Sequence, residues 1–281
     1  MNNNILDLSV VIPFKDKAKM TIDCIKSFYA FGPPVKEILL ISNGSSNTEL
    51  EIIREYIKSK KNVLLFEYNI PFNYQKINNW AVKKTSGKFI MFLNNDTELR
   101  GASTNLINNM YKKAGQKDVG ITGCLLLYGD EKTIQHAGVY LVPSGQADHM
   151  YVGKRYSDAL AKKNTKEYPY DITKDIPMTS VTGAVNIIER EKFNSINGFD
   201  ERFIICGGDV DLCIRLNKKG YQTWFVSGGY ILHKESQSRA HKPVPYNDFY
   251  YSYLSYVQGF DIEVGDPFLP KLTIKERSNN E

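Results

Sequence analysis

The chain has 281 residues, of which 42% are hydrophobic and 24% charged, and its formal net charge is +5. This composition excludes a mainly disordered chain and supplies enough apolar material for one large domain or two small ones. The mild positive charge suits acidic small ligands or an anionic membrane surface. Nucleic-acid binding is not expected, because the basic residues are scattered and no RNP-like or zinc-finger motif occurs.

The chain is expected to remain in the cytoplasm. No stretch approaches the roughly 20 apolar residues that a membrane-spanning helix needs, and the start MNNNILDLSVV lacks the order of a signal peptide. The cysteines show neither zinc-type pairing nor a disulfide framework, so we expect them to lie in the core. They are Cys24, Cys124, Cys206 and Cys213.

The N-terminal part of the chain alternates short β-rich runs with helical patterns. The predicted strands are residues 8–14, 36–42, 62–68 and 88–93, and the predicted helices are residues 19–31, 48–59 and 74–84. Ser46 and Glu49 form a candidate capping box before the second helix. Strands separated by helices of this length indicate right-handed crossovers and a mostly parallel sheet.

Polar residues follow two of these predicted strands. Asn94, Asn95 and Asp96 come directly after residues 88–93, and Ser42–Gly44 end the second strand. Open α/β sheets bind ligands at the carboxyl ends of their strands, so these two loops predict a site. The alternative is that they are ordinary turn and cap residues, which Asn, Asp and Gly favour for backbone reasons.

Two further candidates lie towards the C-terminus. Asp209 and Asp211 open a predicted helix that ends near Gly220, and His233 follows the β-like run of residues 224–232. The helix dipole alone favours carboxylates in a first turn, so both aspartates have a capping explanation. A lone histidine is often structural as well.

Two segments have no clear periodicity of their own. Residues 143–177 turn polar and basic, which predicts a mobile loop over a donor or acceptor site. The aromatic tail of residues 247–270 predicts a C-terminal helix that closes the domain, with core packing favoured. Contact with a second subunit or with a membrane interface remains open, as does the oligomeric state.

As a set, several segments resemble the inverting, metal-dependent glycosyltransferases of family 2, particularly the bacterial members that build surface polysaccharides. The segments are VVIPFKDK, ISNGSS, FNYQKINNWAVKKTSGKFIMFLNNDTEL, IQHAGV, VTGAVNIIEREKFNSINGFDERF, GGDVDLCIRL and HKESQSR. The resemblance covers about residues 8–241 and implies the GT-A fold, an α/β fold with a mostly parallel central sheet flanked by helices. It divides the chain into a domain of residues 1–241, with a donor half of about 1–100 and an acceptor half of about 101–241, and a C-terminal extension of residues 242–281.

The resemblance also implies roles for individual residues. Asp96 and His233 would bind Mn2+ or Mg2+, Asn95 would lie near the ribose, and Asn94 would shape the turn of a DXD-type motif. Asp209 would be the general base, although Gly208 stands where most relatives have Glu, which puts the acceptor contacts in doubt. Further residues would contact the nucleotide, the diphosphate or the donor sugar: Ile12, Pro13, Asn43, Lys76, Asn79, Thr182, Gly183, Ser236, Ser238 and Arg239.

The implied reaction moves a sugar from a nucleotide-diphosphate sugar, such as dTDP-rhamnose or a UDP-hexose, to a glycan hydroxyl. The implied acceptor is a lipid-linked O-antigen, capsule or wall glycan, with peripheral contact at the inner face of the plasma membrane. A nucleotidyltransferase is one alternative, but VVIPFKDK offers no glycine-rich phosphate loop. A non-catalytic sugar-nucleotide-binding module is the other, and it would tolerate the loss of Asp209.

Overall fold

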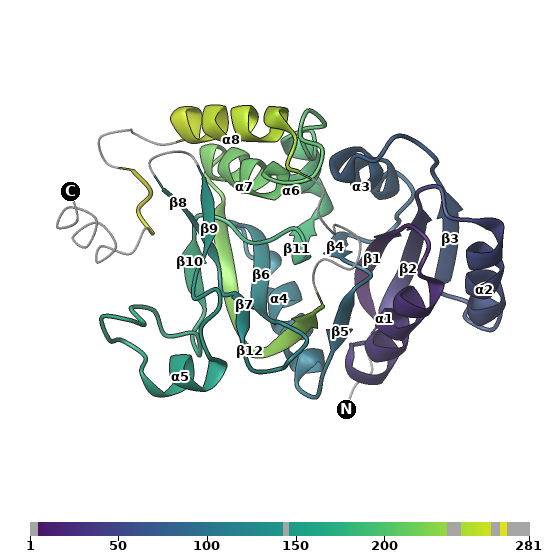
Figure 1. Ribbon diagram of the computed structural model, residues 1–281, viewed down its shortest axis with the longest axis horizontal. Helices are drawn as coiled ribbons and strands as arrows, with labels where there is room; N and C mark the ends of the chain where they lie inside the picture. The colour runs from purple at the N-terminus through teal and green to yellow at the C-terminus, as the bar shows by residue number, and fades with distance from the viewer. Residues whose placement is uncertain (1–4, 143–145, 235–242, 260–264, 269–281) are drawn as a thin grey trace.

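A computed structural model describes residues 5–142, 146–234, 243–259 and 265–268 (Figure 1). Its elements in chain order are β1 (Leu6–Phe14), α1 (Ala18–Phe31), β2 (Val35–Ser42), α2 (Asn47–Ile57), β3 (Val63–Glu67), α3 (Tyr74–Val82), β4 (Phe89–Leu93), β5 (Thr97–Leu99), α4 (Ser103–Ala114), β6 (Val119–Leu127), β7 (Ile134–His136), β8 (Val139–Leu141), β9 (Ala147–His149), α5 (Tyr156–Ala161), β10 (Ile176–Met178), β11 (Val185–Glu189), α6 (Arg190–Ser195), α7 (Gly208–Lys218), β12 (Gln222–His233) and α8 (Tyr246–Gly259).

One large sheet forms the centre of the molecule. Its strands lie in the order β10-β12-β6-β11-β4-β1-β2-β3, with β5 beside β12 and β7 beside β6. The first four strands are parallel, as the sequence predicts. Beyond β4 the sheet is mixed, because β11 runs antiparallel to both of its neighbours. The β4–α4 connection therefore marks the change from a parallel to a mixed sheet.

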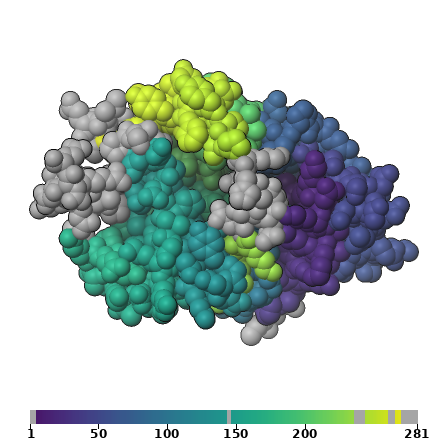
Figure 2. Space-filling model, viewed as in Figure 1, coloured from purple at the N-terminus to yellow at the C-terminus, as the bar shows by residue number. Residues whose placement is uncertain are grey.

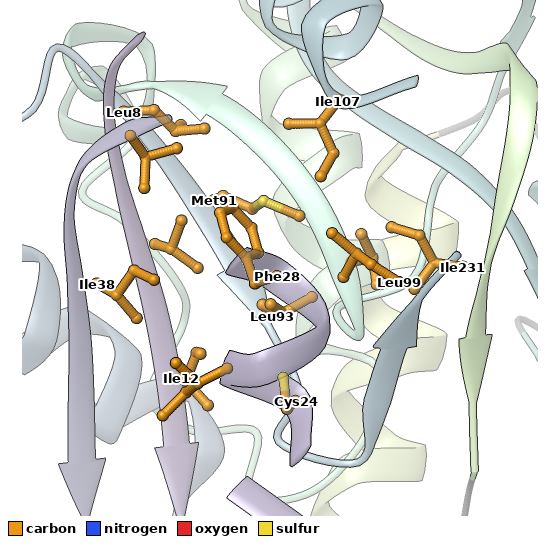
Figure 3. Close-up of a cluster of buried hydrophobic side chains, with 14 of the residues drawn as sticks. Leu8, Ile12, Cys24, Phe28, Ile38, Met91, Leu93, Leu99, Ile107 and Ile231 are labelled. Carbon is orange, nitrogen blue, oxygen red and sulfur yellow. The ribbon is translucent and has the colours of Figure 1, made fainter. Parts of the chain in front are cut away.

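Helices cover both faces of this sheet. Along β4, Met91 and Leu93 pack with side chains of α1, α2 and α4, whereas Ile90 and Phe92 pack with side chains of α3, α6 and α7. Successive strand residues point to opposite faces, so the apolar run FIMFL supplies two cores at once. Figure 3 shows the first of them, where Phe28 of α1 lies against β4.

The predicted elements of the N-terminal part are confirmed with boundary shifts of a few residues. The capping box is only half formed. The Ser46 side chain accepts a hydrogen bond from the backbone of Glu49 at 3.4 Å, but the Glu49 carboxylate accepts from the backbone of Ala18 at 2.5 Å. Glu49 therefore ties α2 to the start of α1 instead of closing its own helix.

The prediction of an open mobile loop over residues 143–177 is wrong for the part that the structure describes. That part contains β9, α5 and the first residues of β10. Tyr168 and Ile172 are 2% and 5% exposed and pack with Met150 and Ala159 in a separate apolar cluster. This lobe, the described part of residues 143–177, packs through a few widely spaced apolar side chains. Its sequence therefore shows neither helical nor strand periodicity.

The C-terminal helix predicted from the aromatic tail is α8, which lies over α7 (Figure 1). Tyr256 is buried against Val210 and Ile214 of α7, so core packing is confirmed for this side chain. Four other aromatic side chains of α8 are 49–80% exposed: Tyr246, Phe249, Tyr250 and Tyr253. Among the described residues, no helix is both long and apolar enough to cross a membrane.

Candidate active site

A cavity of about 680 Å³ opens where the carboxyl ends of β1, β2 and β4 meet the start of α7. Figure 2 shows the purple and blue N-terminal half on one side of the molecule, the teal lobe on the other, and α8 along one edge. The structure brings nine of the predicted site residues together in the cavity wall: Pro13, Asn43, Asn94, Asn95, Asp96, Thr182, Gly183, Asp209 and His233.

Asp96 and His233 meet across this cavity although they lie far apart in the sequence. Asp96 follows β4 and His233 ends β12, and the pairing of β12 with β5 aligns His233 with Thr97. The backbone N–H of Lys234 also donates to the carbonyl oxygen of Asp96 at 2.9 Å. The result is a distance of 3.1 Å between Asp96 Oδ1 and His233 Nε2, with both side chains about 10% exposed.

Gln135 orients this histidine. Its Oε1 accepts a hydrogen bond from His233 Nδ1 at 2.7 Å, which places the imidazole proton on Nδ1. His233 Nε2 therefore directs a lone pair towards the Asp96 carboxylate, and Asn94 Nδ2 lies 3.4 Å from the same nitrogen. A lone pair facing a carboxylate oxygen across 3.1 Å suits a cation between them.

The donor set fits a divalent cation that is also bound by a ligand. In the described part of the chain, no cluster of three or more His, Cys, Asp or Glu side chains is placed to hold a metal ion. One carboxylate and one imidazole leave the other positions of an octahedral shell to phosphate oxygens and water. Gln135 lies in the IQHAGV segment. Its contact with His233 was not predicted, because the segment itself does not indicate which residue Gln135 contacts.

The two asparagines before Asp96 are held by different contacts. The backbone carbonyl of Asn94 accepts from the Thr97 hydroxyl at 2.7 Å and from its N–H at 3.2 Å, and these bonds close the turn. Asn95 Nδ2 donates to the Thr21 hydroxyl at 3.1 Å, which ties the loop to α1. Both side chains line the cavity.

Asp209 faces the same cavity from the first turn of α7. Its Oδ2 accepts from the backbone N–H of Gly183 at 2.6 Å and its Oδ1 accepts from that of Val210 at 3.0 Å. The Tyr74 hydroxyl donates to the carbonyl of Gly183 at 2.8 Å and fixes the other side of that peptide. The carboxylate is thus oriented and half-buried, as a general base must be.

Asp211 has a structural position. Its carboxylate accepts from Arg215 at 2.7 Å and from the Ser255 hydroxyl of α8 at 2.8 Å, and the residue is 6% exposed. These contacts join α7 to α8. The neighbouring aspartates therefore differ, because Asp209 faces the cavity and Asp211 faces the helix pair.

Asp248 of α8 shapes the loop before α7, a role that was not predicted from the sequence. This residue is 1% exposed, and its carboxylate accepts from the backbone N–H groups of Ile204, Ile205 and Cys206 at 2.8, 2.9 and 3.1 Å. Gly207 follows with φ +83°, and a Cβ there would lie 2.4 Å from the Ser252 hydroxyl. Helix α8 therefore fixes the loop that leads to Asp209.

Several predicted site residues do not fit their assigned roles. Ile12 is fully buried in the core (Figure 3), so Pro13 is the residue that reaches the cavity. Lys76 is exposed and does not line the cavity, because it lies on the outer face of α3. The Asn79 amide is bonded to Phe199 and Glu201 and holds their turn. Ser236, Ser238 and Arg239 lie outside the described residues.

Comparison with known families gives this arrangement its context. Residues 9–176, more than half of the chain, match the family model described as glycosyl transferase family 2. The chain belongs to glycosyltransferase family 2. Residues 169–237 of this glycosyltransferase also match the model described as the N-terminal domain of galactosyltransferase.

Two curated relatives illustrate the neighbourhood of this glycosyltransferase. The O-antigen biosynthesis protein RfbC of Myxococcus xanthus is 34% identical over 270 residues, which cover 95% of this chain and 20% of the relative. The N-acetylglucosaminyl-diphospho-decaprenol L-rhamnosyltransferase of Mycobacterium tuberculosis is 33% identical over 67 residues, which cover 24% of this chain and 22% of the relative. The chain thus spans about a fifth of the length of these relatives.

Solved structures confirm the predicted fold class. GalNAc-T7 with UDP, GalNAc and Mn2+ superposes with a TM-score of 0.65 at 19% identity, covering 82% of this chain and 44% of that one. S. aureus TarS 1-349 in complex with UDP-GlcNAc gives 0.60 at 14% identity, covering 89% and 66%. The fold of this glycosyltransferase is therefore GT-A, an α/β fold with a central sheet flanked by helices.

Proposed function

We propose that this glycosyltransferase moves a sugar from a nucleotide-diphosphate sugar to a hydroxyl group of a surface polysaccharide, with inversion at the anomeric carbon. The observation that carries the proposal is that one cavity holds the Asp96–His233 pair and the oriented carboxylate of Asp209. The first suits a diphosphate with its cation, and the second suits a hydroxyl that must lose a proton.

The donor would bind over the strand ends. Asp96 and His233 would hold a Mn2+ or Mg2+ ion, and the nitrogen ligand favours manganese. Such an ion, when bound, neutralises charge on the departing diphosphate. A dTDP-rhamnose or UDP-hexose donor is supported by the relative named as a rhamnosyltransferase and by the neighbour named with UDP-GlcNAc.

The cavity leaves one carboxylate for proton transfer. Among the described lining residues the carboxylates belong to Asp96, Asp209 and Asp248, and Asp248 is occupied by three backbone N–H groups. Asp209 would take the proton of the acceptor hydroxyl as its oxygen attacks the anomeric carbon. The bond from that carbon to the phosphate oxygen breaks, and its electron pair leaves with the diphosphate. One displacement without a second nucleophile inverts the centre.

The acceptor would be a lipid-linked O-antigen, capsule or wall glycan. The names of the relatives support this, since one is an O-antigen biosynthesis protein and another acts on a decaprenol-linked sugar. Peripheral membrane contact is part of the proposal, because the exposed aromatic side chains of α8 suit a membrane interface. We place the donor half at about residues 1–100, the acceptor half at about 101–241 and the extension at 242–281.

A screen of sugar nucleotides tests the proposal. The chain would be heated with UDP-, dTDP- and GDP-sugars, each with and without Mn2+ or Mg2+, and release of nucleoside diphosphate would be measured in parallel. We expect the sugar nucleotides of one nucleobase to raise the melting temperature only when metal is present, and to support turnover. If no nucleotide with either metal shifted the melting temperature, the proposal would be wrong. Pyrophosphate release from nucleoside triphosphates would instead indicate a nucleotidyltransferase.

A further inference from the structure

Gln75 is a buried polar side chain that faces the active-site cavity. It lies in the first turn of α3, is 2% exposed and forms part of the cavity wall. Its Oε1 has no hydrogen-bond partner within the described ranges. A buried carbonyl oxygen in this state costs stability, and such groups in native proteins call for an explanation, of which a bound ligand group is one.

The backbone holds Gln75 close to the start of α7. The Asn73 side chain donates to the carbonyl of Glu201 at 2.9 Å, and the backbone N–H of Tyr74 donates to the carbonyl of Ile204 at 3.0 Å. These two bonds tie the beginning of α3 to the loop that precedes α7. The position of Gln75 relative to that loop is therefore fixed by contacts outside its own side chain.

The carboxamide of Gln75 lies over Gly208. A Cβ placed on Gly208 would be 2.4 Å from both Cδ and Nε2 of Gln75. Any side chain at position 208 would need the space that the carboxamide now occupies. Asp209 is the next residue, and Gln75 and Asp209 line the same cavity.

We propose that the Gln75 carboxamide, which occupies the space that a side chain at position 208 would fill, binds a hydroxyl group of the acceptor sugar in the cavity that Asp209 also lines. This inference rests on the proposed glycosyl transfer. A sugar hydroxyl can donate to Oε1 and accept from Nε2, so it satisfies the amide in either orientation. The contact makes Gln75 a determinant of acceptor recognition.

The charges around the cavity specify the class of that sugar. Of the described residues that line it, Lys15 is the only lysine or arginine, and it follows β1 on the opposite side from α7. Asp209 and the Gln75 amide offer no positive charge to an acidic sugar. We therefore expect the acceptor residue at this position to be a neutral sugar, recognised through its hydroxyl groups.

The test replaces the amide without removing its volume. Gln75→Met keeps an unbranched side chain of similar length but has no carboxamide. Binding of methyl glycosides of rhamnose, glucose, galactose, N-acetylglucosamine and glucuronic acid would be measured by saturation-transfer NMR, with UDP or dTDP and the diamagnetic ion Mg2+ present. In the wild type we expect a signal from at least one neutral glycoside and none from the glucuronide. Gln75→Met should lower the affinity for the neutral glycoside by roughly three- to tenfold.

A matched control lies one turn along the same helix. Asn78 is fully buried and its Oδ1 also has no partner in the part of the chain that the structure describes, but it does not line the cavity. Asn78→Leu should leave glycoside binding unchanged. Gln75→Met should have a melting temperature equal to that of the wild type or up to a few degrees higher, because it removes an unsatisfied buried oxygen.

Each outcome decides one question. Unchanged glycoside binding in Gln75→Met, a strong glucuronide signal, or no signal from any neutral glycoside would overturn the inference. So would a fall in glycoside binding that merely follows a loss of stability, since that indicates a packing role. Nucleotide binding that weakened in Gln75→Met would place the contact on the donor instead. If nucleotide with metal did not raise the melting temperature of the wild type, the result would count against the proposed function itself.

Discussion

The two sides of the cavity are built by different means. The proposed donor side carries Asp96 directly before β5 and His233 at the end of β12, and the pairing of these two strands sets their distance. The proposed acceptor side carries Asp209 on a helix start. Its place depends on the hydrogen bond that the Gly183 N–H donates to Asp209 and on those that the preceding loop donates to Asp248. Sheet pairing is cooperative, whereas isolated side-chain bonds can be changed one at a time. Acceptor recognition should therefore be separable by mutation from donor binding.

The largest separation is expected for Asp209→Asn. The amide keeps the shape of the side chain but cannot take a proton, so kcat should fall by about 10²–10⁴-fold. Nucleotide binding with Mn2+, measured by calorimetry, should stay within about twofold of the wild type. Turnover above a tenth of the wild-type rate would show that another group is the base.

The next effect is expected on stability, in the variant Asp248→Ala. Its loss would leave three backbone N–H groups of the 204–206 loop without their acceptor, and we expect the free energy of unfolding in urea to fall by about 3 kcal/mol. Asp248→Asn is the matched control, because it keeps one acceptor oxygen and should lose less. Equal stability of the alanine variant and the wild type would contradict the role given to α8.

On the donor side, Gln135→Leu should weaken the metal site without unfolding the protein. Without the acceptor at Nδ1 the imidazole of His233 is no longer held in one tautomer, and Mn2+ affinity in the presence of UDP should fall by about 10–100-fold. Electron paramagnetic resonance of free Mn2+ measures this directly. Gln135→Glu restores an acceptor oxygen and should recover most of the affinity, and a leucine variant with unchanged affinity would refute the assignment.

The smallest effect concerns Glu98, which lies in β5 and pairs with Lys234 and Arg100. Burial raises the pKa of its carboxyl, but hydrogen bonds from Lys234 and Arg100 outweigh this and hold the pKa below its ordinary value of 4.5. A lowered folded-state pKa contributes stability above the unfolded value, and that stability is lost as the pH falls through the folded value. The free energy of unfolding of the wild type should exceed that of Glu98→Gln by up to about 1 kcal/mol at pH 7. This difference should shrink as the pH falls below 4.5 and through the folded-state pKa, and a constant difference would contradict the pKa direction.

The donor side was also the part that could be predicted from sequence. Strands β1–β4 are short apolar runs between helical patterns, so local periodicity located Asp96 at a strand end without knowledge of distant contacts. The resemblance to family 2 supplied His233 and Asp209. Gln135 remained hidden, because its role depends on a histidine that lies on another strand.

The rest of the acceptor side depends on contacts between distant segments. Asp248 stands among aromatic residues and resembles any polar residue on an exposed helix face until the 204–206 loop is placed against it. The lobe of residues 146–177 forms around Tyr168 and Ile172, which are too sparse to set a period. Gly208 was recognised as a departure from the family, but only the structure shows that Gln75 fills its space.

Crystals soaked with Mn2+ and UDP test the central claim most directly. Anomalous scattering locates manganese without regard to the assumed chemistry. We predict one peak at roughly 2 Å from both an Asp96 carboxylate oxygen and His233 Nε2, and in contact with the diphosphate. A peak that touches Asp96 but not His233, or one bound elsewhere, would contradict the account.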